Sequence, residues 1–145
     1  MKLISHRGNL NGPIKDKENQ PEYIKNAINS GFDCEIDVWH LNDNFYLGHD
    51  CPQYKIQIEF LLNNKLWCHA KNLSAFYNML ENKNIHCFWH QKDDFTLTSQ
   101  NFIWAYPNMP LSDLSVCVLP ELGFCGKLEI CHGICSDQIL KYKNK

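Results

Sequence analysis

Residues 32–39 read Phe32-Asp33-Cys34-Glu35-Ile36-Asp37-Val38-Trp39, a stretch in which apolar and acidic side chains alternate. An alternation with a period of two predicts a β-strand, because successive side chains of a strand point to opposite faces. The apolar residues would then share one face, and Asp33, Glu35 and Asp37 the other. A helical pattern over residues 21–30 precedes the strand, with Pro21 in its first turn and Gly31 as its stop.

Short apolar segments on both sides of this stretch extend the pattern. Early strands alternate with helices, which favours βα units and a largely parallel sheet. The later part of the chain carries few helical patterns. The residues therefore predict an α/β fold in a single domain over residues 1–145. The expected strands lie at 3–6, 32–39, 45–50, 66–71, 85–90, 102–106, 116–119 and 133–135, and the expected helices at 21–30, 58–62 and 72–80.

Length and composition exclude several classes of protein. The chain has 145 residues, a formal net charge of −2 and a pI near 6.4. A full-size eight-fold βα barrel needs roughly 250 residues, so it is excluded. The one basic run, at residues 141–145, is too short to indicate nucleic-acid binding. We find neither a membrane span nor the apolar core of a secretory signal, and we expect a cytoplasmic protein with mostly buried, unpaired cysteines.

The carboxylates of residues 35 and 37 are the first candidate site. Glu35 and Asp37 are two residues apart, so both project from the same side of their strand. Two like charges on an otherwise apolar strand repel each other unless a cation or a base lies between them. A hard divalent ion would resolve that repulsion, because such ions prefer carboxylate oxygens. The alternative is a strand whose acidic face is simply solvated.

Two histidines point to proton transfer. His6 and His49 each follow a predicted strand, and Arg7 stands beside the first of them. Histidine titrates near neutral pH, so one ring can accept a proton while the other donates one. The planar fork of arginine matches phosphate oxygens. The alternative for each histidine is a structural residue at a strand end.

Six short segments stand out in order along the chain: His6-Arg7-Gly8, Glu18-Asn19-Gln20-Pro21-Glu22, Glu35-Ile36-Asp37 and Gly48-His49-Asp50, followed by Ala70-Lys71 and Gly133-Ile134-Cys135-Ser136-Asp137. The order of the first four resembles the signature of the glycerophosphodiester phosphodiesterase family, in the PLC-like phosphodiesterase superfamily of TIM barrels. The last two resemble the family's Glu-x-Lys strand and its last barrel strand. The resemblance implies an abbreviated member with a compact or reduced TIM-like (β/α) barrel, in which several connecting helices are missing.

The same resemblance implies a role for each matching residue. It implies His6 and His49 as the acid/base pair, Glu35 and Asp37 as metal ligands, Arg7 and Lys71 as phosphate contacts, and Glu18 as support for the His6–Arg7 end of the site.

The chain departs from the family pattern at three points. The family has a glutamate as third metal ligand two residues before the lysine, and here that position is His69. Imidazole suits Mn²⁺ or Zn²⁺ better than Ca²⁺, so His69 favours these ions over a site for Mg²⁺ or Ca²⁺. Gln20 replaces a small hydroxyl residue. The short length also removes loops that would normally build the substrate pocket.

These features predict metal-dependent hydrolysis of a small glycerophosphodiester-like substrate by His/His acid–base catalysis. One alternative is a barrel that binds a phosphorylated ligand with little or no turnover, which the His69 change favours. Another is an enzyme that cyclises the diester by transphosphorylation. His90 either lines the same pocket or caps its strand. The oligomeric state stays open.

Overall fold

The computed structural model describes residues 1–143, so Asn144 and Lys145, the end of the basic run, lie outside the described residues. Residues 1–143 form ten strands, two α-helices and four short 3-10 turns. The strands are β1 (Lys2–His6), β2 (Asp33–Leu41), β3 (Asn44–Leu47), β4 (Tyr54–Ile56), β5 (Leu66–Ala70), β6 (Cys87–Phe88), β7 (Phe95–Leu97), β8 (Ile103–Ala105), β9 (Ser115–Val118) and β10 (Gly133–Ser136). The helices are α1 (Pro21–Asn29) and α2 (Leu73–Leu80), and the turns are η1 (Ile58–Leu62), η2 (Pro120–Leu122), η3 (Leu128–Ile130) and η4 (Ile139–Tyr142).

The strands form one curled sheet that is largely parallel. Parallel pairs run in the order β6–β5–β2–β1–β10–β9–β8. Antiparallel partners extend this series, with β3 and β4 beside the far end of β2 and β7 beside β8. Within residues 1–143 no strand ladder joins β6 to β7 or β8. Instead, the Ser99 N–H donates to the Cys87 carbonyl (2.8 Å), and the Cys87 N–H donates to Ser99 Oγ (2.9 Å).

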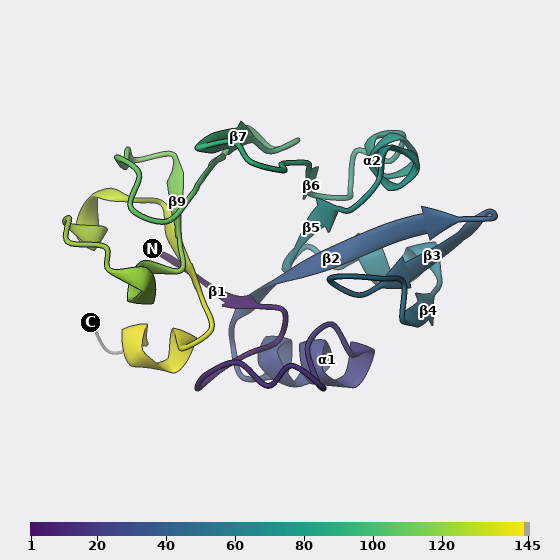
Figure 1. Cartoon of the computed structure of the whole chain (residues 1–145), viewed down its shortest axis with the longest axis horizontal. Coiled ribbons are helices and arrows are strands. Elements are labelled where there is room, and N and C mark those ends of the chain that lie inside the picture. Colours follow the sequence, from purple (N-terminus) through teal and green to yellow (C-terminus); the bar gives the residue numbers. More distant parts are fainter. Residues whose placement is uncertain (144–145) are drawn as a thin grey trace.

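Both helices lie on the outside of the curl, α1 against β2 and α2 against β2 and β5 (Figure 1). Helix α1 begins at Pro21, whose fixed φ and missing N–H suit a first helical position. Helix α2 begins after Asn72, whose side chain accepts the Ala75 N–H at 2.9 Å. The outer apolar cluster joins these helices to the backs of β2 and β5, with Ile24, Ile36, Cys68 and Met79 among its buried members.

The inside of the curl holds a second apolar cluster. Register places Ile4 opposite Cys135, and Trp104 opposite Val116, all on this inner face. Apolar side chains therefore fill the lower part of the inner face. This layer, called here the floor, lies beneath the polar side chains of the same face. The members of this floor are Ile4, Trp67, Phe88, Trp104, Val116, Val118 and Cys135.

The structure confirms a mixed α/β fold and refines the sequence-based expectations. Its curled, half-barrel sheet with few helices is compatible with a reduced barrel. The helix expected at residues 58–62 is a 3-10 turn, and the strand expected at 85–90 shrinks to two residues. Two strands, β4 and β7, were not expected, because each has only three residues and both lie at sheet edges.

All eight cysteines are free thiols, and six of them are buried, as expected for small apolar residues. Among the described residues, no helix is long and apolar enough to cross a membrane.

Candidate active site

The predicted site residues gather where the carboxyl ends of β1 and β5 lie beside the middle of β2. Register pairs His6 of β1 with Glu35 of β2, and Asp37 of β2 with His69 of β5. Glu35 is also paired with Trp67, a member of the inner apolar floor, so the acidic face of β2 points to the inside of the curl. The alternative of a solvated acidic face is wrong, because Glu35 is 2% and Asp37 0% exposed.

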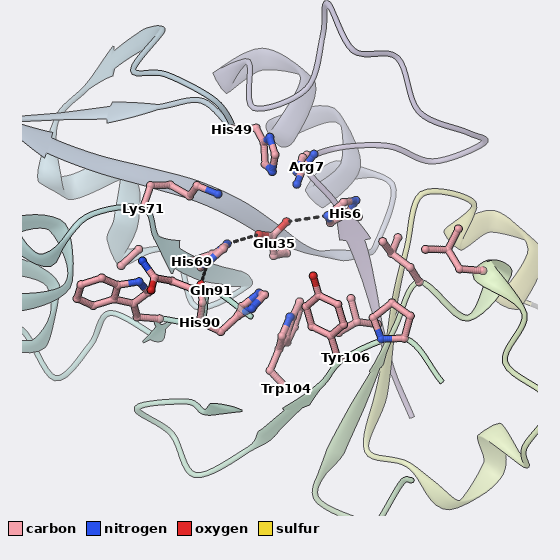
Figure 2. A pocket seen from close by; sticks show the side chains of 16 residues that line it. His6, Arg7, Glu35, His49, His69, Lys71, His90, Gln91, Trp104 and Tyr106 are labelled. Atoms are coloured by element: carbon pink, nitrogen blue, oxygen red, sulfur yellow. Dashed lines mark hydrogen bonds and ion pairs between the residues drawn. The ribbon is translucent and has the colours of Figure 1, made fainter. Parts of the chain in front are cut away.

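A cavity of about 420 Å³ opens above this floor. Figure 2 shows Glu35 near its middle, with Arg7, His49 and Lys71 on one side and His90, Trp104 and Tyr106 on the other. Every residue that the sequence predicts for catalysis, phosphate contact or metal binding lines this cavity or contacts a residue that does. The lining residues are His6, Arg7, Glu35, His49, His69, Ala70, Lys71, Trp89, His90, Gln91, Trp104, Tyr106, Pro107, Val118, Leu119 and Leu122.

Asp37 is the most heavily partnered residue of the site. Asn19 Nδ2 donates to its Oδ2 (2.9 Å), and the Asp37 N–H donates to Asn19 Oδ1 (2.9 Å). Arg7 Nε lies 3.0 Å from Oδ2, and Lys71 Nζ lies 3.5 Å from Oδ1. Burial raises the pKa of Asp37, but the interaction with His69 and the charges on Arg7 and Lys71 outweigh it, so the pKa lies well below its ordinary value. Asp37 is therefore ionised.

Asn19 is a site residue to which the sequence assigned no role. It is fully buried and lies at a positive φ of 62°, a conformation that asparagine tolerates better than most residues. Its N–H donates to the Arg7 carbonyl (3.1 Å), so one residue fixes both Asp37 and the end of β1. Asn19 belongs to the segment Glu18-Asn19-Gln20-Pro21 that resembles the family signature, so the sequence could have pointed to it, but only Glu18 was assigned a role there.

Glu35 is the carboxylate that lacks partners. Its Oε2 accepts no hydrogen bond from residues 1–143. The nearest ion-pair partners are His6 Nε2, 3.8 Å from Oε2, and His69 Nδ1, 3.8 Å from Oε1. Burial, followed by the charge on Asp37, raises the pKa of Glu35 above its ordinary value. Glu35 is thus short of positive charge and of hydrogen-bond donors.

His69 completes a group that can hold a metal ion. Its Nε2 lies 3.1 Å from the His90 carbonyl oxygen, which can only accept, so Nε2 carries a proton. Nδ1 faces Asp37 Oδ1 at 3.1 Å and Glu35 Oε1 at 3.8 Å. In a neutral ring Nδ1 carries a lone pair, and this lone pair faces two carboxylates. Such an arrangement is repulsive unless a second ring proton or a cation lies between the ring and the carboxylates.

These three ligands lie close enough together to hold one ion if the Glu35 side chain moves slightly toward His69, since His69 Nδ1 is 3.1 Å from Asp37 Oδ1 and 3.8 Å from Glu35 Oε1. Donor atoms of Glu35, Asp37 and His69 all lie within 4.8 Å of one another. Two ligands that are each about 2.1 Å from an ion are roughly 3.0–3.4 Å apart in octahedral or tetrahedral geometry. A ring N–H bonded to a backbone carbonyl is also the usual support of a metal-bound histidine. The donor set therefore fits a divalent cation.

His6 is held by a residue from the far end of the chain. Its Nδ1 lies 2.8 Å from Asp137 Oδ1, just after β10, and Asp137 in turn accepts from Asn9 Nδ2 (2.8 Å). The Asp137 N–H donates to Glu121 Oε1 (2.9 Å), which fixes the carboxylate. Burial lowers the pKa of His6, but the Asp137 hydrogen bond and the Glu35 charge outweigh it and raise the pKa above its ordinary value. The sequence assigned no role to Asp137 or Glu121.

His49 approaches the pocket from the loop after β3. The Trp39 Nε1–H donates to the Gly48 carbonyl (2.7 Å), and Gly48 has a φ of 147° with the Cys51 carbonyl packed against it. A Cβ at residue 48 would meet that carbonyl, so the turn requires glycine. Burial lowers the pKa of His49, and the Arg7 charge acts in the same direction. The two predicted acid/base residues thus differ: His6 favours the charged form and His49 the neutral form.

Glu18 contacts the residues that follow β1. Its Oε2 lies 3.2 Å from Arg7 Nη1, and its Oε1 accepts from Asn9 Nδ2 (2.9 Å). Arg7 has a φ of 55°, so the chain turns sharply there and delivers the guanidinium toward Asp37.

His90 lines the pocket and does not merely cap its strand. Its ring stacks on His69 (4.5 Å between centroids), and Tyr106 meets it edge-on. Burial lowers the pKa of His90 to about 4, with the charges on His69 and Lys71 acting the same way. His90 is therefore neutral near pH 7.

In comparisons with known proteins, no family model, curated protein or solved structure matches this chain.

Proposed function

We propose that the chain is a metal-dependent phosphodiesterase that hydrolyses a glycerophosphodiester-like substrate on a reduced TIM-like barrel. One observation carries the proposal: a single cavity brings two histidines and two cationic side chains around a buried group of metal-ligand type. The order of these residues along the chain also resembles the glycerophosphodiester phosphodiesterase family. His6 and His69 lie at the carboxyl ends of the parallel strands β1 and β5, and this is the end at which βα barrels carry their active sites.

Glu35, Asp37 and His69 would hold the cation. The unsatisfied Glu35 Oε2 and the direction of His69 Nδ1 support this assignment. A bound divalent ion would neutralise charge on the phosphate oxygens. Carboxylates admit Mg²⁺, Mn²⁺ or Ca²⁺, and the imidazole favours Mn²⁺ or Zn²⁺.

The two histidines divide the proton transfers between them. His6 keeps its proton because Asp137 and Glu35 flank it, so it donates to the leaving oxygen of the diester. His49 stays neutral and accepts the proton of the attacking hydroxyl, which belongs either to water or to the substrate. Arg7 and Lys71 bind the phosphate oxygens through their positive charge. Attack by a substrate hydroxyl would give a cyclic phosphate, so the identity of the product separates hydrolysis from transphosphorylation.

One observation favours the alternative of a binding protein with little turnover. Both oxygens of Asp37 are already engaged, by Arg7 and Asn19 on one side and His69 on the other. A carboxylate that is neutralised in this way binds a cation more weakly than a free one.

The test is product release from a panel of glycerophosphodiesters and lysophospholipids with Mg²⁺, Mn²⁺, Ca²⁺, Zn²⁺ or chelator. We expect metal-dependent release that His6→Ala lowers by about 10²–10⁴-fold, the usual contribution of one acid–base group. In parallel, Mn²⁺ is titrated calorimetrically into wild type, Glu35→Gln and the exposed control Glu129→Gln. Loss of binding in Glu35→Gln alone is the expected result. Metal binding without release of any product would support the binding protein instead, and equal binding by all three proteins would overturn the metal site.

A further inference from the structure

The cavity has two chemically unlike sides. Its charged side comes from β1, β2, β5 and the loop after β3. The opposite side comes from the carboxyl ends of β8 and β9 and from η2, and none of the described residues that line the cavity there is charged. That side, called here the apolar wall, consists of Tyr106, Pro107, Val118, Leu119 and Leu122, while the polar His90 and Gln91 line the cavity after β6.

Part of the apolar wall is open to solvent although it lines a concavity. Leu122 is 60% and Tyr106 42% exposed. Apolar side chains that face the inside of a pocket stay hydrated until a ligand covers them, and such surfaces mark ligand-binding sites. Trp104 and Tyr106 lie across the cavity from Arg7 and His49 (Figure 2).

The backbone of the wall is strained at Leu119. This residue has φ 47° and ψ 55°, and Pro120 follows it. The left-handed region is unfavourable for leucine, and a following proline disfavours helical conformations further. The Leu119 N–H donates to the Cys135 carbonyl at 2.7 Å, so β10 holds the residue in place. Strain of this kind persists where neighbouring contacts hold the residue in its unfavourable conformation, and such residues are common at ligand-binding sites.

The cavity is larger than a phosphate group alone would fill. About 420 Å³ lies in the range of pockets for small organic ligands. A phosphorus atom bound between Arg7, Lys71 and the metal-ligand group occupies the charged side. One substituent of the diester then extends along the apolar wall.

Resting on the proposed function, we propose that the substrate is a phosphodiester with one alkyl or aryl substituent, and that the apolar wall binds this substituent. A diester whose two substituents are both small and polar would leave the wall hydrated. The wall is therefore the specificity-determining part of the site.

A second apolar concavity provides the control. It has about 480 Å³, lies beside β7 and β8, and is lined by no charged residue, so it offers nothing to recognise phosphate. Leu97 lines it and is 64% exposed, which matches the exposure of Leu122 on the apolar wall. Serine at either position removes a solvent-exposed leucine side chain without touching the buried core.

The first arm of the test measures binding without turnover. Methyl, butyl and octyl phosphate, each below its aggregation concentration, are titrated calorimetrically into the Mn²⁺-loaded protein. We expect the Kd to fall by about tenfold or more from methyl to octyl phosphate, because each covered methylene adds apolar contact. Leu122→Ser should remove most of this dependence and Leu97→Ser should leave it. Equal Kd values along the series, or loss of the dependence in Leu97→Ser alone, would overturn the proposal.

The second arm measures turnover on two glycerol phosphodiesters, one whose second substituent is a small polar head group and one whose second substituent is a short alkyl chain. We expect the kcat/KM ratio to favour the alkyl diester by about tenfold, and Leu122→Ser to abolish that preference. Turnover of both without preference would refute the role of the wall while supporting the phosphodiesterase. Chain-dependent binding with no turnover of any diester would refute the phosphodiesterase and keep the wall. Activity on the same head group in phosphatidylcholine vesicles, compared with the soluble compound, separates a lipid substrate from a free one.

Discussion

The two parts of the chain build their sides of the cavity by different means. The amino-terminal part, residues 2–80, carries both α-helices and the longer strands, and it supplies His6, Arg7, Glu35, Asp37, His49, His69 and Lys71. The carboxyl-terminal part, residues 85–143, has strands of two to four residues and no α-helix among those described. It supplies the apolar wall, His90 and Asp137, and Glu121 accepts the N–H of Asp137.

This difference reflects what each kind of side chain needs. A buried charge is tolerated when several partners hold it, and those partners need a rigid backbone. Asp37 has such partners because β2 is fixed between β1 and β5 and backed by α1 and α2. An apolar wall needs a shape but no hydrogen bonds, so short strands and turns suffice.

The largest effect is expected from removing a proton-transfer group on the charged side. His49→Ala should lower turnover of the best diester by about 10²–10⁴-fold and leave the unfolding temperature nearly unchanged, because the side chain is about 40% exposed. The matched control is His40→Ala, since His40 bonds Ser74 on the outer surface and does not line the cavity. Equal rates for the two variants would show that His49 has no catalytic role.

A smaller effect is expected from the residue that supports the charged side. Asn19→Gly keeps the positive φ but removes both side-chain hydrogen bonds to Asp37. We expect a loss of about 2–4 kcal/mol in the free energy of unfolding, because a buried N–H and part of a buried carboxylate lose their partners. Urea unfolding measures it.

The control for Asn19→Gly is Asn101→Gly, which changes an exposed asparagine at a φ of 65°. It should change stability by less than about 0.5 kcal/mol. A similar change in both variants would mean that Asp37 does not depend on Asn19.

The smallest effect concerns a neutral histidine of the carboxyl-terminal part. His86 packs on Trp67 and lies 2.8 Å from Thr98 Oγ1, and burial lowers its pKa to about 4. The unfolded chain binds a proton near pH 6.5, so His86 favours folding fully above that pH, and its contribution is lost as the pH falls from about 6.5 to about 4. We expect this loss to be about 2 kcal/mol.

Urea unfolding of wild type and His86→Gln at pH 7, 6, 5 and 4 measures that contribution. The variant should show the shallower decline toward acid pH. Parallel curves would mean that His86 has the same pKa in the folded and unfolded chain. His6, whose pKa is raised, responds oppositely: its contribution is present at low pH and is lost as the pH rises through its folded pKa.

Much of the site followed from local patterns. The alternation at residues 32–39 was enough to predict β2 and to place Glu35 and Asp37 on one side of it. The strand ends at His6 and Lys71 and the cap at Asn72 were likewise predicted, because each depends on neighbours within a few positions along the chain.

Other features depended on contacts between distant residues. The alternation of apolar and acidic residues in β2 is the same whether its acidic face points to solvent or to the inside of the curl. The pairing with β5 and the apolar floor beneath decide that it points to the inside. Asp137 reaches His6 across 131 positions, and the direction of His69 is set by the carbonyl of His90. The sequence alone therefore determined which residue types and local elements are available. Tertiary structure decided which carboxylate is fully partnered and which is left short of positive charge, because desolvation and ion pairing arise only when distant strands come together.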